Sequence, residues 1–376
     1  MQTPIPSLFM RGGTSRGPFF LASDLPSDIA TRDRVLLAIM GSPDARQIDG
    51  MGGAHPLTSK VGIVSLSSTS GVTLDFLFAQ LQPNGSTVDT TPNCGNMLAA
   101  VLPFALERGL IAAQGDTTTA RVLTLNTGMQ CDITVQTPFF GSQRQVSYAG
   151  DTRIDGVPGS SAPVSINFLD TAGSVCASLL PTGRVRDRVE VDGVGFAPFS
   201  IDVTCIDNGM PLVLFRAADL GYSGYESVAE LNADAALKQR LEALRLQCGH
   251  LMGLGDVSAR NYPKMTLIAP AREGGSICTR SFIPHVCHDA IGVLAAVTVG
   301  TACVLAGSVC DGVAQLSADA AGRVSVEHPS GEFCVELGLD PADPQKVLRA
   351  ALLRTARLIM RGEVMVPAAL WQPTNT

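Results

Sequence analysis

Charged and aromatic residues are scarce in this sequence. Of 376 residues only 16% are charged and 5% are aromatic, with a single tryptophan. The net charge is −7 and the basic residues are scattered, so no basic stripe could follow a phosphate backbone and few rings could stack on bases. We therefore expect no nucleic-acid partner.

Long hydrophobic runs are also missing. No stretch reaches the roughly 18 uninterrupted apolar residues that a membrane-spanning helix needs. The longest candidate, residues 291–309, is interrupted by glycines, threonines and a serine. The first residues lack a charged segment followed by an apolar one, which argues against a signal peptide. We expect a cytoplasmic protein with no membrane partner.

The ten cysteines include no Cys-x-x-Cys pair, and most lie within apolar runs. This usage is typical of reduced thiols that act as small apolar side chains in the cytosol. His285, Cys287 and His288 cluster, but no fourth ligand follows at a spacing typical of a metal site. We expect no metal, and we expect these histidines to shape an anion-binding site instead.

What the sequence has in abundance is apolar residues (45%) and glycine (38 residues), which favours a large core and a β-rich fold with many turns. The length predicts two domains. A polar stretch at 180–197, rich in glycine and proline, sets the expected boundary, giving domains 1–185 and 186–376, with the last strand free to return to the first domain. The alternating or apolar segments expected as strands are 6–10, 61–66, 73–81, 122–126, 131–136, 164–168 and 199–206.

Three helices are predicted. Residues 96–108 and 288–305 are apolar nearly all round and should be buried, the first with a kink at Pro103. Residues 232–249 form an expected surface helix with Asn232 as N-cap, Leu237, Leu241 and Leu244 on one face, and Gly249 as terminator. The two buried helices lie about one domain apart, each after a strand and a polar loop, which predicts two similar halves. Their N-termini would suit a substrate with several carboxylates in a shared cleft.

Three segments carry candidate chemistry. The loop from Arg11 to Arg16 combines glycines with hydroxyl and guanidinium donors, as an anion-binding loop would, although an ordinary glycine turn would look the same. Lys60 stands where an apolar strand begins. Burial of an amine disfavours its charged form and makes it a usable base, and the alternative is a lysine that only extends to solvent at a strand end.

Cys94 lies in Asn93-Cys94-Gly95-Asn96 at the expected start of a buried helix, which favours a reactive thiol beside backbone N–H donors. The alternative is one more buried cysteine. A cysteine hydrolase is disfavoured because nothing marks a partner histidine.

The motifs Met10-Arg11-Gly12-Gly13-Thr14-Ser15, Leu57-Thr58-Ser59-Lys60 and Asn93-Cys94-Gly95-Asn96, together with residues 41–53, 151–159, 206–211, 254–257, 281–285 and 353–357, resemble the PrpF-like isomerase family over most of the chain. The resemblance implies an α+β fold like that of diaminopimelate epimerase, with two pseudo-symmetric β/α domains around buried helices. Within the family it is most similar to the 4-oxalomesaconate tautomerases and isomerases of gallate and protocatechuate-type aromatic catabolism.

The resemblance also implies a 1,3-proton shift in a small polycarboxylate without metal or organic cofactor. Lys60 and Cys94 fall on the family's catalytic positions. Arg16 stands where relatives commonly have lysine, which keeps the charge but changes its geometry. The substrate is expected to contact Arg11, Thr14, Ser15, Arg16, Ser59, Asn93, Gly95, Asn96, Ser281 and His285.

Two other functions stay open. One is isomerisation of 2-methylaconitate or aconitate, and the other is a non-catalytic anion-binding accessory protein, against which the presence of Lys60 and Cys94 argues. A homodimer is allowed by the sequence but not indicated by it.

Overall fold

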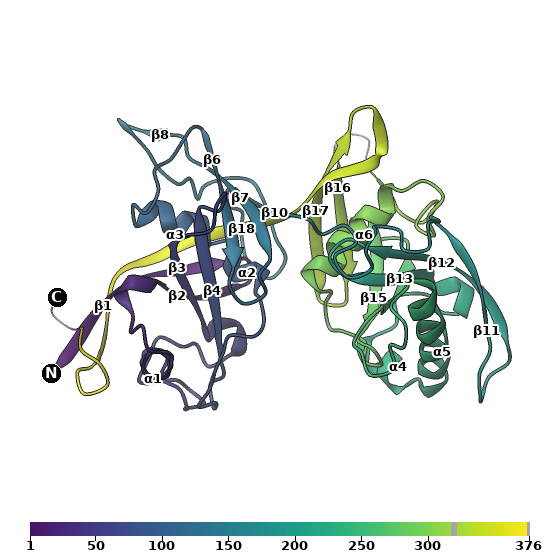
Figure 1. Ribbon diagram of the computed structural model, residues 1–376, viewed down its shortest axis with the longest axis horizontal. Helices are drawn as coiled ribbons and strands as arrows, with labels where there is room; N and C mark the ends of the chain where they lie inside the picture. The colour runs from purple at the N-terminus through teal and green to yellow at the C-terminus, as the bar shows by residue number, and fades with distance from the viewer. Residues whose placement is uncertain (317–321, 374–376) are drawn as a thin grey trace. The chain divides into compact units, whose positions relative to one another are not determined.

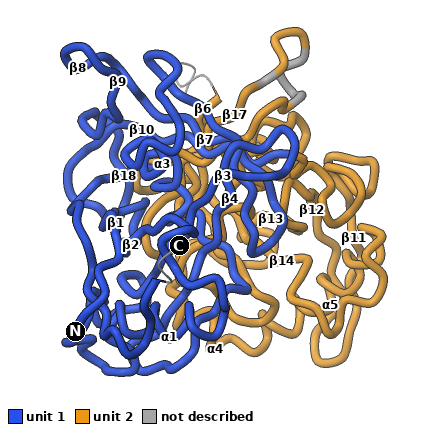
Figure 2. The backbone as a smooth tube through the Cα atoms, turned by 60° about the vertical axis from the view of Figure 1, so that its left-hand side comes forward, with its two compact units in different colours: residues 1–169, 354–376 blue, residues 170–353 orange. Residues whose placement is uncertain are grey.

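The computed structural model describes residues 1–316 and 322–373, which form two compact units (Figures 1 and 2). Unit 1 comprises residues 1–169 and 354–376, and unit 2 comprises residues 170–353. This division differs from the expected boundary at 185/186. Residues 170–186 associate with unit 2 because Asp207 accepts hydrogen bonds from the N–H groups of Val175 and Cys176 and donates its own to the carbonyl of Leu179.

Unit 1 is a closed ring of eight strands. The order is β1-β2-β3-β4-β6-β7-β10-β18, and β18 also pairs with β1, through Ala356–Pro367. The ring strands are β1 (Gln2–Gly12), β2 (Ser15–Leu21), β3 (Lys60–Leu66), β4 (Leu74–Leu81), β6 (Thr117–Thr124), β7 (Gln130–Gln136), β10 (Pro163–Phe168) and the C-terminal part of β18 (Asp343–Pro367). Short elements complete it: η1 (Ala22–Asp24), α1 (Ile29–Met40), η2 (Pro56–Thr58), β5 (Val88–Asp89), β8 (Phe139–Phe140) and β9 (Gln143–Arg144).

A buried helical segment lies within this ring. It consists of α2 (Gly95–Leu98), which contacts β1 and β2, and α3 (Val101–Glu107), which contacts β3 and β7. The expected helix is therefore present, with its interruption at Ala99–Ala100. Pro103 explains the position, because a proline cannot donate to the carbonyl four residues earlier, that of Ala99, and its ring clashes there.

Unit 2 is a twisted sheet that packs on helices on both faces. Its strand order is β18-β17-β16-β15-β14-β13-β12-β11. The strands are β11 (Asp187–Val191), β12 (Phe199–Asp207), β13 (Pro211–Arg216), β14 (Lys264–Ala269), β15 (Ile277–Phe282), β16 (Arg323–His328), β17 (Gly331–Asp340) and the first part of β18. One core cluster is built around α6 (Val293–Val304) and another around α5 (Ala235–Leu251), with η3 (Ala217–Leu220) and α4 (Val228–Ala233) beside it.

The prediction of two similar halves around buried helices, in an α+β fold, is confirmed. In each unit a pair of parallel neighbours (β2–β3, β13–β14) is followed by an antiparallel one (β3–β4, β14–β15). A further parallel pair (β4–β6, β15–β16) flanks the buried helix, and an antiparallel pair (β6–β7, β16–β17) ends the series. The expected strands and the hairpin at 122–136 are also present.

Two helix starts were predicted wrongly. The N-cap of α5 is Asp234, whose carboxylate accepts from the N–H of Leu237, while the side chain of Asn232 accepts from Cys287 instead. The helix also continues past Gly249 to Leu251, and Gly249 is needed because a Cβ there would lie 2.6 Å from Val257.

The third helix, α6, begins at Val293 rather than at His288. The ring of His288 accepts a hydrogen bond from the N–H of Ala290, which fixes a turn before the helix. Among the described residues, no helix is both long and apolar enough to cross a membrane.

Candidate active site

Lys60 is the first residue of β3 and is 7% exposed. β3 lies between β2, to which it is parallel, and β4, to which it is antiparallel. The approach to the neighbouring segment is close: a Cβ on Gly17 would lie 1.7 Å from the carbonyl oxygen of Lys60, so only glycine fits there. The backbone at Lys60 is thus fixed by both neighbouring strands.

The Lys60 amine contacts a thiol, an amide and an aromatic ring. Its Nζ lies 3.6 Å from the Cys94 Sγ and donates to the Gln80 Oε1 at 2.7 Å. It also lies 4.9 Å from the centre of the Phe78 ring, within the range of a cation–π contact. The two predicted catalytic side chains, which are 34 residues apart in sequence, are therefore brought into direct contact.

Gln80 fixes the direction of the amine and was missed by the sequence analysis. Its Nε2 lies 2.8–3.2 Å from the carbonyl oxygens of Pro56, Ser59 and Leu81, so the amide cannot flip and its Oε1 must face Lys60. Lys60 and Gln80 are directly opposite in the β3–β4 pair. Both strands were predicted from the sequence. The contact between Lys60 and Gln80 follows only from how the two strands are aligned, which the sequence analysis did not predict.

Cys94 is the N-cap residue of α2, as its motif predicted. The Asn93 side chain accepts from the N–H of Cys94 at 2.8 Å, which holds the loop before the helix. The N–H groups of Gly95 and Asn96 belong to the first turn and have no partner within the helix. The thiol thus contacts the Lys60 amine and belongs to the residue that precedes these backbone donors.

The segment from Arg11 to Arg16 is a hairpin turn between β1 and β2, with Gly13 at φ +48°. Arg11 turns back into unit 1: its Nη1 donates to the carbonyl of Gly13 at 2.9 Å and to the carbonyl and hydroxyl of Thr355 at 3.1 and 2.9 Å. Burial lowers its pKa, and the nearby charge of Arg357 lowers it further. In this structure Arg11 therefore stabilises the turn.

The turn packs directly on the first turn of α2. A Cβ on Gly12 or Gly13 would lie 2.3 or 2.1 Å from Asn96, so both positions need glycine. The Asn96 side-chain Nδ2 donates to the Thr14 hydroxyl at 2.9 Å, and the buried Arg354 donates from Nε to the Asn96 side-chain Oδ1 at 3.2 Å. Thr14 and Asn96 are thereby held beside the Cys94 segment.

The remaining predicted residues of unit 1 surround this group. Ser15 is buried, and its hydroxyl has no hydrogen-bond partner among the described residues. The Arg16 guanidinium lies 5.7 Å from the centre of the Phe9 ring. Ser59 donates to the side chain of the buried Gln47, a second residue that the sequence analysis missed. Gln47 also accepts from the N–H of Ala54, and the two hydrogen bonds stabilise the segment 47–59.

Ser281 and His285 belong to unit 2. The Ser281 hydroxyl is buried and shares a hydrogen bond with Thr266 at 2.8 Å. His285 is half exposed, and its Nδ1 lies 3.6 Å from a carboxylate oxygen of Glu242 on α5. Neither opens α6, which begins at Val293, so their expected contact with substrate stays a prediction.

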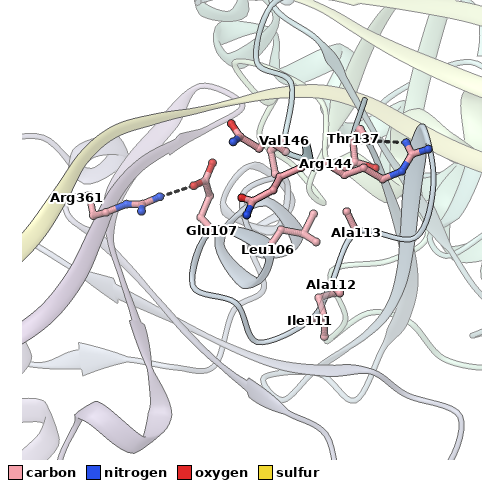
Figure 3. A pocket seen from close by; sticks show the side chains of 11 residues that line it. Leu106, Glu107, Ile111, Ala112, Ala113, Thr137, Arg144, Val146 and Arg361 are labelled. Atoms are coloured by element: carbon pink, nitrogen blue, oxygen red, sulfur yellow. Dashed lines mark hydrogen bonds and ion pairs between the residues drawn. The ribbon is translucent and has the colours of Figure 1, made fainter. Parts of the chain in front are cut away.

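A cavity of about 660 Å³ in unit 1 involves none of the predicted site residues (Figure 3). Arg361 and Glu107 form an ion pair at its edge, and Glu107 also accepts from the Tyr148 hydroxyl at 3.2 Å. Burial and the adjacent carboxylate raise the pKa of Tyr148, so this hydroxyl stays protonated. The cavity lining offers no base beside an acid comparable to Lys60 and Cys94.

The chain resembles known proteins in both sequence and fold. The chain is 54% identical over 370 residues to a 4-oxalomesaconate tautomerase of Pseudomonas putida, covering 98% of each chain. It is 52% identical to a (4E)-oxalomesaconate Delta-isomerase of Novosphingobium, covering 96% of this chain and 97% of the relative. The crystal structure of a methylitaconate-delta-isomerase matches with a TM-score of 0.83 and 32% identity, covering 100% of this chain and 98% of the other. The PrpF protein family matches residues 2–367, and the chain belongs to that family.

Proposed function

We propose that this protein is a cofactor-independent isomerase that catalyses a 1,3-proton shift in 4-oxalomesaconate, with Lys60 and Cys94 as the groups that carry the proton. The observation that carries the proposal is the 3.6 Å contact between the Lys60 Nζ and the Cys94 Sγ. The names of the two most similar relatives reported above support the choice of substrate.

The chemistry needs a base and an acid at one allylic unit. Lys60, acting as the base, would take a proton from the saturated carbon next to the conjugated system, breaking that C–H bond. The electron pair would move into the conjugated system as a dienolate, whose charge the N–H groups of Gly95 and Asn96 would stabilise. A proton returned to the far end forms a new bond there, so the product has the same atoms with the double bond moved.

The surrounding residues suit an anionic substrate. The loop with Thr14, Ser15 and Arg16 and the Asn93–Asn96 segment would offer hydroxyl, guanidinium and amide donors to its carboxylates. Gln80 would keep the amine directed during both transfers. Ser59, Ser281 and His285 are further candidates for substrate contact, and Arg11 would act mainly by stabilising the loop.

The proposal is tested by mixing chelator-treated protein with the keto form of 4-oxalomesaconate. Ultraviolet absorbance follows the conversion, and proton NMR in deuterated water shows where deuterium enters. Rapid conversion with deuterium at one carbon is expected. No conversion would refute this substrate, and 2-methylaconitate and aconitate would then be tried in the same assay.

The Cys94→Ser variant identifies the group that returns the proton. If the thiol delivers it, turnover should fall by about 10²–10⁴-fold, the range of a lost general acid. If Lys60 both removes and returns the proton, turnover should change little. Either result leaves the reaction class intact and assigns the second transfer.

A further inference from the structure

Unit 2 repeats the strand pairings that hold Lys60 in unit 1. In the parallel pair β2–β3, the last residue of β2 aligns with Val64, four residues after Lys60. In the parallel pair β13–β14, the last residue of β13 aligns with Ile268, four residues after Lys264. A 3-10 helix follows directly in both units, η1 in one and η3 in the other. Lys264 therefore occupies in unit 2 the strand position of Lys60.

The residue beside the lysine also corresponds. In unit 1 the helix between the parallel strands β4 and β6 has Cys94 as its N-cap, next to Lys60. In unit 2 the helix between the parallel strands β15 and β16 has Gly292 as its N-cap. A Cβ built on Gly292 would lie 3.5 Å from the Lys264 Nζ. The amine thus again lies beside the N-cap, but the N-cap carries no thiol.

The amide that directs Lys60 has no counterpart either. Continuing the β14–β15 register one residue beyond the Met265–Phe282 pair places Ile283 opposite Lys264. An isoleucine side chain cannot accept a hydrogen bond. Among the described residues, no hydrogen bond or ion pair of the Lys264 amine is present.

This amine is partly buried without a compensating charge. Burial lowers the pKa of Lys264, and no charged neighbour in the described part of the chain contributes to that shift. A cation in this setting gains from an anionic ligand more than an exposed lysine does, because its water is already partly removed. The glycine leaves space next to the amine for that ligand.

We infer that Lys264 is a substrate-binding residue, the counterpart of Lys60 in unit 2, and that it binds a carboxylate of the substrate without transferring a proton. Because no thiol or amide lies beside it in the described part of the chain, the amine lacks a partner for a proton relay, and its ammonium form would attract a carboxylate. The identity of the ligand as a polycarboxylate rests on the proposed function.

The test is steady-state kinetics of the full chain with 4-oxalomesaconate. Lys264→Met should raise KM by about 10- to 100-fold, as expected for a lost charge-assisted hydrogen bond, while kcat stays within about threefold. Lys264→Arg keeps the charge and should restore most of the affinity. Lys238→Met, on α5 of the same unit, is the matched control and should behave like the unmodified protein. Lys264→Gln serves as a second neutral variant if Lys264→Met folds poorly by circular dichroism.

An unchanged KM in both neutral variants would overturn the inference while leaving the proposed function in place. If the unmodified protein does not convert 4-oxalomesaconate, the proposed function fails. The role of Lys264 is then tested by calorimetry, which measures the affinity of each protein for tricarballylate. Weaker binding to Lys264→Met than to the unmodified protein would support the inference. Equal affinity, or no binding to the unmodified protein, would refute it.

Discussion

The two units place a lysine at the same strand position but surround it differently. Lys60 contacts an amide oxygen, a thiol and an aromatic ring, whereas Lys264 lies beside a glycine and has no such partner among the described residues. The strand pairings alone therefore do not make a lysine a catalyst. The neighbours at the opposite strand and at the helix N-cap decide what the amine can do.

The largest expected effect is on kcat, when each of the two lysines is replaced by arginine. Lys60→Arg keeps the charge but cannot act as a base, since guanidinium does not lose its proton. We expect kcat to fall by about 10²–10⁴-fold in both Lys60→Arg and Lys60→Met. Lys264→Arg should keep nearly full activity. Stopped-flow absorbance measures the conversion, and an active Lys60→Arg variant would show that charge rather than proton transfer is needed.

The structure also shows what the sequence could and could not predict. Lys60 and Cys94 were identified because each lies in a local motif, and the strands because alternation of apolar residues is a local property. Gln80 was not identified, since its importance comes from the register between two strands. The start of α6 was misplaced because the sequence around His288 looks apolar enough for a helix, while a turn held by its own ring precedes it.

The next effect concerns the amide that directs Lys60. Gln80→Leu makes the surroundings of Lys60 more like those of Lys264, with an apolar side chain opposite the amine. We expect kcat to fall by about 10²-fold, because a displacement of about 1 Å at a reacting group can cost that much. Single-turnover kinetics would separate this loss from changes in binding.

Gln82→Leu is the matched control for this change, since Gln82 is exposed just beyond the same strand. It should leave kcat unchanged. If Gln80→Leu also retained full activity, the contact at 2.7 Å would be dispensable, and the thiol alone would distinguish the two lysines.

A smaller effect follows from the pKa of Lys264, which burial lowers. A lysine with a lowered pKa loses its charge at a lower pH than an exposed lysine does. If its ammonium binds a substrate carboxylate, KM should rise on the alkaline side, by up to about 10-fold, as that charge is lost. Lys264→Arg should abolish this rise because arginine stays charged, and KM measured across alkaline pH in both proteins tests it. A parallel rise in Lys264→Arg would assign the titration to another group.

The smallest effect concerns the two buried helices, one interrupted and the other continuous over Val293–Val304. Pro103→Ala supplies the missing N–H and removes the clash with the carbonyl of Ala99. The proline lies in the first turn of α3, where it is tolerated, so we expect the free energy of unfolding to change by no more than about 1 kcal/mol. Urea denaturation measures this. The informative readout is activity: if the interruption helps to position Cys94 against Lys60, kcat should fall while stability holds, and an unchanged kcat would show that the interruption only relieves local strain.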